Sequence, residues 1–335
     1  MFILSLNNFM AYFLKNLFIT FFIFFVFSKT SLSNETLSLE DNFFPEGIAV
    51  SKNGDLFVGS LKENKVVRLK KNGKKFEEFI PSKTDDLLSV IGMIVDDYNK
   101  ILWVCSSYPG VTNYPVDNPV VSLKAFDLST GNPIDSYPLP GGGFCNDVTI
   151  DKDHNVYITD SFNPRVLRLN KSKSRLETWF ENDAFKGEGF NLNGITFINN
   201  NIYLVKMNSG ELFKIGIADN GKPINFKKII LPRSLSAPDG IEAIDKNNLL
   251  VVENKDGNLA KINLSDPIKI EIIKDNLDTP TTAAIKGNTA WVLQAQFGHL
   301  FGDEKDIPPG PFEIAVVEFK PSFLTSIKKL LNFLK

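Results

Sequence analysis

The sequence predicts an all-β protein, a six-bladed β-propeller built from four-stranded antiparallel blades. A hairpin pattern recurs six times, its copies are about 40 to 55 residues apart, and further β-rich runs follow most copies, which is the period of propeller blades. In the first copy, the apolar residues 44–50 and the β-rich residues 56–59 flank Asn53 and Gly54. Asn-Gly between two such runs is a strong hairpin signal, because both residues tolerate the positive φ of a tight turn.

The other copies repeat this order of apolar run, turn and second apolar run, and the sixth copy is degenerate. We expect residues 35–40 to add the outer strand of the sixth blade, because this closes the ring and leaves no open edge. The propeller is predicted to span residues 34–320. Counted from Gly47, the equivalent positions of the later copies are Gly92, Asp147, Gly194, Gly240 and Thr282.

Composition agrees with a globular chain and excludes one class of partner. The 335 residues are 43% hydrophobic and 23% charged, which is ordinary for a protein with a sizeable core. The formal net charge is -2, whereas a nucleic-acid-binding protein needs a basic footprint. We therefore expect no nucleic acid as a partner, while the oligomeric state stays open.

The first 33 residues have the pattern of a signal peptide. Lys15 precedes the apolar run 17–27, and Ser31-Leu32-Ser33 offers a cleavage site with small residues. The run is too short to cross roughly 30 Å of hydrocarbon. We predict export to the periplasm or the outside of the cell, with an uncleaved membrane anchor as the alternative.

The C-terminal residues 321–335 change to a helical period. Leu324, Ile327, Leu330, Leu331 and Leu334 fall on one face, which predicts a short amphipathic helix. We expect this helix to pack against the propeller; a peripheral contact with a membrane surface is the alternative.

The two cysteines stand near each other in the predicted fold. Cys105 ends the second hairpin and Cys145 begins the third, and neighbouring blades would bring these positions together. A disulfide would suit an exported chain. Two free, buried cysteines would suit the sequence equally.

Candidate metal ligands occupy one equivalent position in four blades. The innermost strand of each blade lines the central channel, so residues at the start of that strand converge on the axis. Glu46, Asn146, Asn193 and Asp239 hold this position. Two carboxylates and two amides suit a hard divalent cation such as calcium. The alternative is that they only cap turns, where Asn and Asp are common.

The second strands run back to the same end of the blades, so their last residues are candidates for the substrate shell. Ser107, Lys206 and Gln296 are the substrate-binding candidates of this kind. An ammonium group at Lys206 would attract an acidic substrate or stabilise an oxyanion, unless it is an ordinary surface lysine. Asp160 is expected instead to accept hydrogen bonds from backbone donors of its own blade.

Four motifs resemble the senescence-marker-protein/gluconolactonase group of six-bladed propellers, whose superfamily includes paraoxonases and drug-responsive lactonases. The motifs are residues 45–47, 144–147, 193–195 and 238–241, and the resemblance covers about residues 43–319. It implies one divalent metal ion held by Glu46, Asn193 and Asp239, with Asn146 ligating the ion or touching substrate. Calcium is the first expectation, with zinc, magnesium or manganese as alternatives.

The resemblance also implies hydrolysis of a lactone or similar ester, in which the metal polarises the carbonyl group. Asp239 or Asp147 would take the proton, because the histidine dyad of paraoxonases finds no match. Residues 147–166 look like an NHL-type repeat as well. The competing hypothesis is therefore a non-enzymatic propeller that binds a small molecule or a protein and whose metal is structural.

Overall fold

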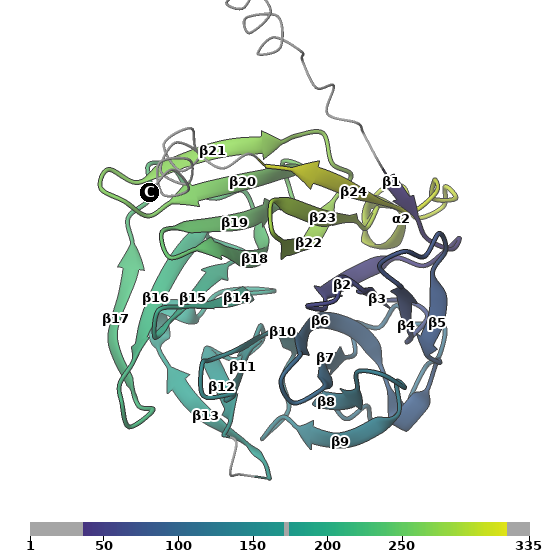
Figure 1. Ribbon diagram of the computed structural model, residues 1–335, viewed down its shortest axis with the longest axis horizontal. Coiled ribbons are helices and arrows are strands. Elements are labelled where there is room, and N and C mark those ends of the chain that lie inside the picture. Colours follow the sequence, from purple (N-terminus) through teal and green to yellow (C-terminus); the bar gives the residue numbers. More distant parts are fainter. Residues whose placement is uncertain (1–35, 171–173, 320–335) are drawn as a thin grey trace, which may run out of the picture. The chain divides into compact units, whose positions relative to one another are not determined.

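The computed structural model describes residues 36–170 and 174–319, which form a six-bladed β-propeller (Figure 1). It contains six four-stranded sheets, as the sequence predicts. The first strands of neighbouring blades contact one another around a central axis. The expected signal segment 1–33 and the expected C-terminal helix 321–335 lie outside the described residues. None of the helices within the described ranges is long and apolar enough to cross a membrane.

Within each of the first three blades, strand order follows the sequence from the axis outward, and all pairs are antiparallel. Short 3-10 helices, η1 (Thr84–Asp86) and η2 (Asp183–Phe185), follow the first and the third blade. The strands of these blades are β2 (Pro45–Val50), β3 (Leu56–Ser60), β4 (Val66–Leu69), β5 (Glu77–Ile80), β6 (Ser89–Asp96), β7 (Ile101–Ser107), β8 (Ser122–Asp127), β9 (Pro133–Pro138), β10 (Cys145–Ile150), β11 (Val156–Asp160), β12 (Arg165–Leu169) and β13 (Leu176–Glu181).

The last three blades follow the same plan, except that the sixth blade takes its outer strand from the start of the described chain. A four-residue helix, α2 (Gly298–Phe301), lies in the loop between the last two strands. The strands are β14 (Leu192–Ile198), β15 (Asn201–Lys206), β16 (Glu211–Ile217), β17 (Pro223–Ile229), β18 (Pro238–Asp245), β19 (Asn248–Glu253), β20 (Asn258–Asn263), β21 (Lys269–Lys274), β22 (Pro280–Lys286), β23 (Thr289–Gln294), β24 (Glu313–Glu318) and β1 (Thr36–Ser38).

The core lies between the blades, and the second strands show why. Every residue of β11 is buried, because both faces of the strand are covered by neighbouring blades. Val156 and Ile158 pack in one hydrophobic cluster and Tyr157, between them, packs in another. Alternation along a strand thus sends side chains to two different blade interfaces. Outer strands are more polar, and β9 is largely exposed.

The ring closes as predicted, because β1 pairs with β24 in antiparallel register, Thr36 opposite Ala315. The sixth and first blades are joined again near the axis, where the Thr281 hydroxyl donates to the Glu46 carbonyl oxygen at 3.0 Å. Because β1 comes from the start of the described chain and β24 from its end, their pairing closes the ring and leaves the edge of β24 covered.

The first hairpin forms, but its turn is not a two-residue Asn-Gly turn. Val50 pairs with Leu56, so five residues connect the strands. Gly54 has a positive φ of 98°, and the Ser51 hydroxyl accepts from the amide of Asp55 at 3.0 Å. The side chain of Ser51 supplies a bond that the tighter turn would not need.

All six inner hairpins contain a β-bulge at the same place, which the sequence analysis did not foresee. In the first blade, Pro45 pairs with Ser60 and Ile48 with Val58, so two residues oppose one. The same register shift occurs in the first strand pair of every other blade. A bulge changes the direction of a side chain, and four of the six bulges contain a metal-ligand candidate, namely Glu46, Asn146, Asn193 or Asp239.

Glycine at the second bulge position follows from close backbone approach. A Cβ added to Gly47 would lie 1.9 Å from the Ile91 carbonyl oxygen, and one added to Gly194 would lie 2.4 Å from the Asp239 carbonyl oxygen. First strands of adjacent blades therefore touch backbone to backbone. At Gly47 and Gly194 no side chain fits without a shift of the backbone.

We predict that Gly47→Ala lowers the free energy of unfolding by about 1–3 kcal/mol, the usual cost of overpacking. Denaturant titration measures this. The matched control is Gly310→Ala, whose Cβ would meet only an ordinary contact at 3.6 Å. Equal stability of the two variants would contradict the close-approach explanation.

Candidate functional site

A cavity of about 210 Å³ lies at one end of the propeller axis, where the first strands begin and the second strands end. The first bulge residue of five blades lines it. Four of these residues are polar, and they are the four metal-ligand candidates of the sequence analysis. The equivalent positions in blade order are Glu46, Ile91, Asn146, Asn193, Asp239 and Thr281, of which Thr281 alone does not line the cavity.

The rest of the cavity wall is apolar and comes mainly from loops. Phe144 and Phe190 precede first strands, and their rings meet edge to face with centroids 5.0 Å apart. Phe297 and Phe301, from the loop between β23 and β24, supply another part of the wall and also pack edge to face, at 5.5 Å. The remaining apolar lining residues are Leu61, Ile91, Pro109 and Met207.

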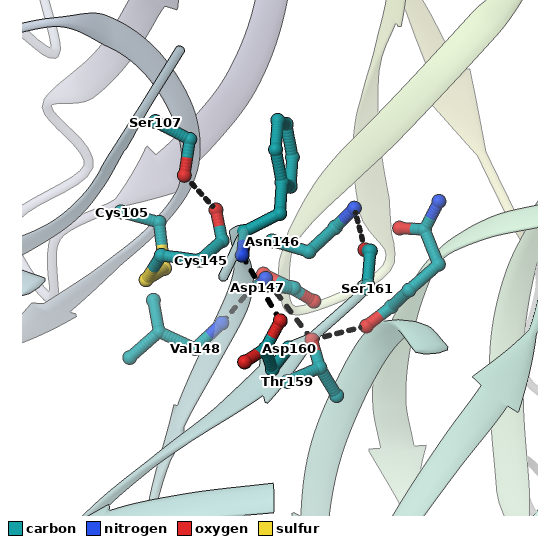
Figure 2. The surroundings of a disulfide bond; sticks show 11 residues. Cys105, Ser107, Cys145, Asn146, Asp147, Val148, Thr159, Asp160 and Ser161 are labelled. Atoms are coloured by element: carbon teal, nitrogen blue, oxygen red, sulfur yellow. Dashed lines mark hydrogen bonds between the residues drawn. A yellow bond between two sulfur atoms is a disulfide. The ribbon is translucent and has the colours of Figure 1, made fainter. Parts of the chain in front are cut away.

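Hydrogen bonds leave oxygen atoms available at the polar end of the cavity. The Asn146 amide nitrogen donates to the Ser161 hydroxyl at 2.9 Å (Figure 2), and the Asn193 amide nitrogen donates to the Met207 sulfur at 3.5 Å. Each amide oxygen is thereby left as an acceptor. The Glu46 Oε2 atom is buried and has no hydrogen-bond partner. A buried acceptor without a donor is costly, and a cation would satisfy it.

Four carboxyl groups near the axis have raised pKa values, through burial in every case and through the charge of Asp147 in three of them. Burial, then the charges of Asp239 and Asp147, raise the pKa of Glu46 well above its usual range. Burial and the charge of Asp147 raise the pKa of Asp239, against a hydrogen bond from Asn193 that lowers it. Burial raises the pKa of Asp147 to about 7, and burial with the charge of Asp147 raises that of Glu242 to about 8. None of the causes of these pKa shifts is a nearby cation. The carboxyl groups therefore lie close together without a compensating positive charge.

Asp147 takes the bulge position that glycine holds in four other blades, and it joins two blades. Its carboxylate accepts from the backbone amides of Val148 and Ile195, both at 2.9 Å. Ile195 belongs to β14, so the bond links the third blade to the fourth. Asp147 does not line the cavity, although its charge reaches Glu46 and Asp239. Both of its oxygens are engaged by the protein backbone.

The disulfide Cys105–Cys145 lies directly beside this group (Figure 2). It joins β7 to β10 and thus the second blade to the third, which decides between the two alternatives that the sequence left open. The Ser107 hydroxyl reinforces the link by donating to the Cys145 carbonyl oxygen at 2.9 Å. Asn146, next in the chain, is therefore held from both sides.

The candidates at the ends of the second strands are bonded to backbone and do not line the cavity. The Lys206 ammonium donates to the carbonyl oxygens of Ala184 and Lys186, at 3.1 and 2.7 Å. The Gln296 side chain accepts from the amide of Gly310 at 2.9 Å and donates to the Pro311 carbonyl oxygen at 3.0 Å. Their common role in the structure is to fasten the loops around the cavity.

Asp160 shows the same role, as expected from its sequence context. Its Oδ1 atom accepts from the backbone amides of Phe144 and Phe162, at 2.9 and 3.1 Å. Its Oδ2 atom accepts from Arg165 Nε at 2.9 Å. Phe144 is thereby fixed at the cavity wall by a buried carboxylate.

Sequence reasoning missed Glu242 and the aromatic wall. Glu242 lies three residues after Asp239 on β18, and the equivalent residues of the other blades carry no carboxylate, so the repeat gave no signal for it. Phe297 and Phe301 lie in the irregular 295–312 loop, where no repeat marks their position. Loop residues of this kind are found only when the fold brings them to the axis.

A larger open groove, of about 860 Å³, lies on the other side of Phe190 and Met207, which line both spaces. Arg233, one of the charged residues that line it, is paired with the buried Glu253, Nη2 to Oε2 at 2.8 Å. The axial cavity is the better candidate site, because it gathers the uncompensated carboxylates.

This geometry defines a six-bladed propeller with an acidic cavity on its axis, and solved structures share the fold. The chain is similar to regucalcin, a calcium-binding protein from Agrobacterium tumefaciens (TM-score 0.64, 15% identity, 86% of this chain and 96% of that chain). It is similar to a gluconolactonase from Xanthomonas campestris (TM-score 0.59, 14% identity, 84% and 88%). It is also similar to virginiamycin B lyase from Staphylococcus aureus (TM-score 0.57, 16% identity, 85% and 99%).

No protein-family model and no curated protein matches the sequence. At identities of 14–16%, the similar structures establish the fold alone. The fold that the motif resemblance implies is therefore confirmed. What the protein does chemically depends on the residues of its own cavity.

We predict that the protein without divalent cation loses stability as pH rises from about 4, where unfolded carboxyls titrate, to 7 and 8, where Asp147 and Glu242 titrate. The sign follows because the folded state binds more protons than the unfolded state throughout this window. Thermal unfolding across pH measures the slope. Glu242→Gln should flatten it, whereas the same change at the exposed Glu271 should not. A slope unchanged by Glu242→Gln would contradict the assignment.

Proposed function

We propose that the protein is a metal-dependent hydrolase that opens a lactone or a similar ester at the axial cavity. The observation that carries the proposal is the set of four oxygen-bearing side chains, Glu46, Asn146, Asn193 and Asp239, on one cavity. The fold is also that of a gluconolactonase and of a calcium-binding propeller. A small cavity with convergent polar groups is typical of a small-molecule site.

The donor set fits a hard divalent cation, with calcium as the first choice. Within residues 36–170 and 174–319, no group of three or more His, Cys, Asp and Glu side chains is arranged to hold a metal ion. A cation here therefore depends on amide oxygens as well as the two carboxylates, as calcium sites do. The unpartnered Glu46 Oε2 atom and the crowded negative charge support this assignment.

The chain's own residues have distinct roles in this proposal. Glu46, Asn193 and Asp239 hold the cation, and Asn146 ligates it or contacts the substrate. When bound, the cation supplies Lewis-acid polarisation of a carbonyl oxygen. Asp239 lines the cavity and takes the proton from the attacking water. Asp147, the other candidate base, holds the third and fourth blades together through the bond that its carboxylate accepts from the Ile195 amide.

We also propose that the protein is exported, after removal of the N-terminal segment. The buried disulfide supports this, because disulfides persist mainly in oxidising compartments. An uncleaved anchor would place the same propeller at the outer surface of a membrane, where the disulfide would persist as well.

We predict that Glu46→Ala and Asp239→Ala each abolish specific calcium binding, because each removes one of the two carboxylates of the cavity. Isothermal titration calorimetry on the folded variants measures binding. Asp153→Ala, at an exposed turn, is the control and should bind as the wild type does. Undiminished affinity in both cavity variants would exclude the site.

We predict that Asp239→Asn, assayed at saturating metal, loses roughly 100-fold or more of the lactone hydrolysis rate, the scale of general base catalysis. The change keeps an oxygen donor and removes the group that takes the proton. Asp147→Asn should lose less activity and more thermal stability. A larger rate loss in Asp147→Asn would identify that residue as the base.

Activity itself is tested with the wild type and a panel of lactones and esters. A chelator should silence hydrolysis, and added calcium should restore it. Failure of the metal-loaded protein to hydrolyse any member of the panel would favour the binding propeller with a structural metal.

A further inference from the structure

The axial cavity is polar at one end and apolar elsewhere. Eight of its twelve lining residues are apolar, and the polar four are Glu46, Asn146, Asn193 and Asp239. The polar residues lie on first strands, whereas most apolar ones lie on loops at the same end of the propeller. A ligand therefore meets oxygen atoms at one end and hydrocarbon along its remaining surface.

Hydrogen-bonding side chains are confined to the four polar residues at one end, so the rest of the wall offers nothing to the hydroxyls of a sugar. None of its lining residues is Ser, Thr, Tyr, Lys, Arg or His. At the polar end, one hydrogen of each side-chain amide is already donated, to the Ser161 hydroxyl in Asn146 and to the Met207 sulfur in Asn193. A hydroxyl placed against such a wall loses its bonds to water and gains none, which costs affinity.

We propose that the ligand of this cavity is a small apolar lactone or ester, carrying one carbonyl group and an alkyl or aryl body, and not a polyhydroxylated sugar lactone. This inference rests on the proposed function only where it identifies the carbonyl group as that of the lactone or ester that is hydrolysed. The apolar selectivity follows from the walls themselves.

The size of the cavity limits the ligand further. An engineered apolar cavity of about 150 Å³ holds benzene, so a cavity of about 210 Å³ holds a six-membered ring with a short alkyl chain. Phe301 stands at the mouth of the cavity with 55% of its surface exposed. An exposed aromatic ring that continues an apolar cavity gains buried area when ligand binds.

Binding without turnover tests the selectivity directly, and lactams serve as probes because their rings resist hydrolysis. Calorimetry with calcium present compares the δ-lactam that carries a propyl group beside nitrogen with gluconolactam. We expect the propyl lactam to bind at least about tenfold more tightly and with a negative heat-capacity change. Equal binding, tighter binding of gluconolactam, or no binding of the propyl lactam would overturn the inference.

The wall is tested with a matched pair of variants in one loop. Phe301 lines the cavity, whereas Ile307 has a similar exposure of 56% and does not line it. Phe301→Ala should weaken binding of the propyl lactam about tenfold, and Ile307→Ala should leave it unchanged. Because both side chains are exposed, both variants should fold. Equal affinities in the two variants would count against the apolar wall.

Turnover of the corresponding lactones separates this inference from the proposed function. Preferred hydrolysis of gluconolactone would overturn the apolar selectivity and leave the hydrolase standing. Tight binding of the propyl lactam without hydrolysis of either lactone would support the apolar cavity and reject the hydrolase. Hydrolysis of the propyl lactone in preference to gluconolactone would support both.

Discussion

The close approach of backbones around the axis determines most of this structure. Because first strands of adjacent blades touch, the second bulge position is glycine in four blades, as at Gly47 and Gly194, and in the third blade it carries a side chain that bonds to the next blade. Asp147 is the second kind, and its carboxylate reaches the Ile195 amide. The same crowding withdraws the neighbouring carboxylates from water, which raises their pKa values. The close approach of the first strands therefore explains both the glycines of the ring and the raised pKa values of the carboxyl groups.

A second consequence of the ring is a division of labour along each inner hairpin. First strands present side chains to the cavity, while the last residues of second strands secure the loops around it. Ser107, Asp160 and Lys206 are chemically different, yet each bonds to backbone near the start of a first strand or the loop before it. Buried polar groups with satisfied bonds fix the positions of neighbouring groups. The cavity walls are thus held by side chains that do not themselves line the cavity.

The fold was predictable from sequence because the repeat period, the strand patterns and the closing strand all depend on local apolar spacing. The polar end of the cavity was predictable for the same reason, since Glu46, Asn193 and Asp239 recur at one position of the repeat. The bonding of Lys206 and Gln296 was not, because strand position says where a side chain begins and not which backbone atom it meets. The wall residues Phe297 and Phe301 belong to a loop outside the repeat. Their position depends on tertiary contacts alone.

The pairing of β1 with β24 has a consequence for how the chain matures. At about 5–20 residues per second of synthesis, β24 emerges some tens of seconds after β1, so the sixth blade is completed last. Non-local pairing of this kind is slow because the loop-closure entropy must be met first. Glu46 of the first blade and Asp239 of the fifth face each other only in the closed ring. A cation at the axis would therefore bind only after the ring has closed. Its binding would stabilise the closed ring over the open chain by mass action.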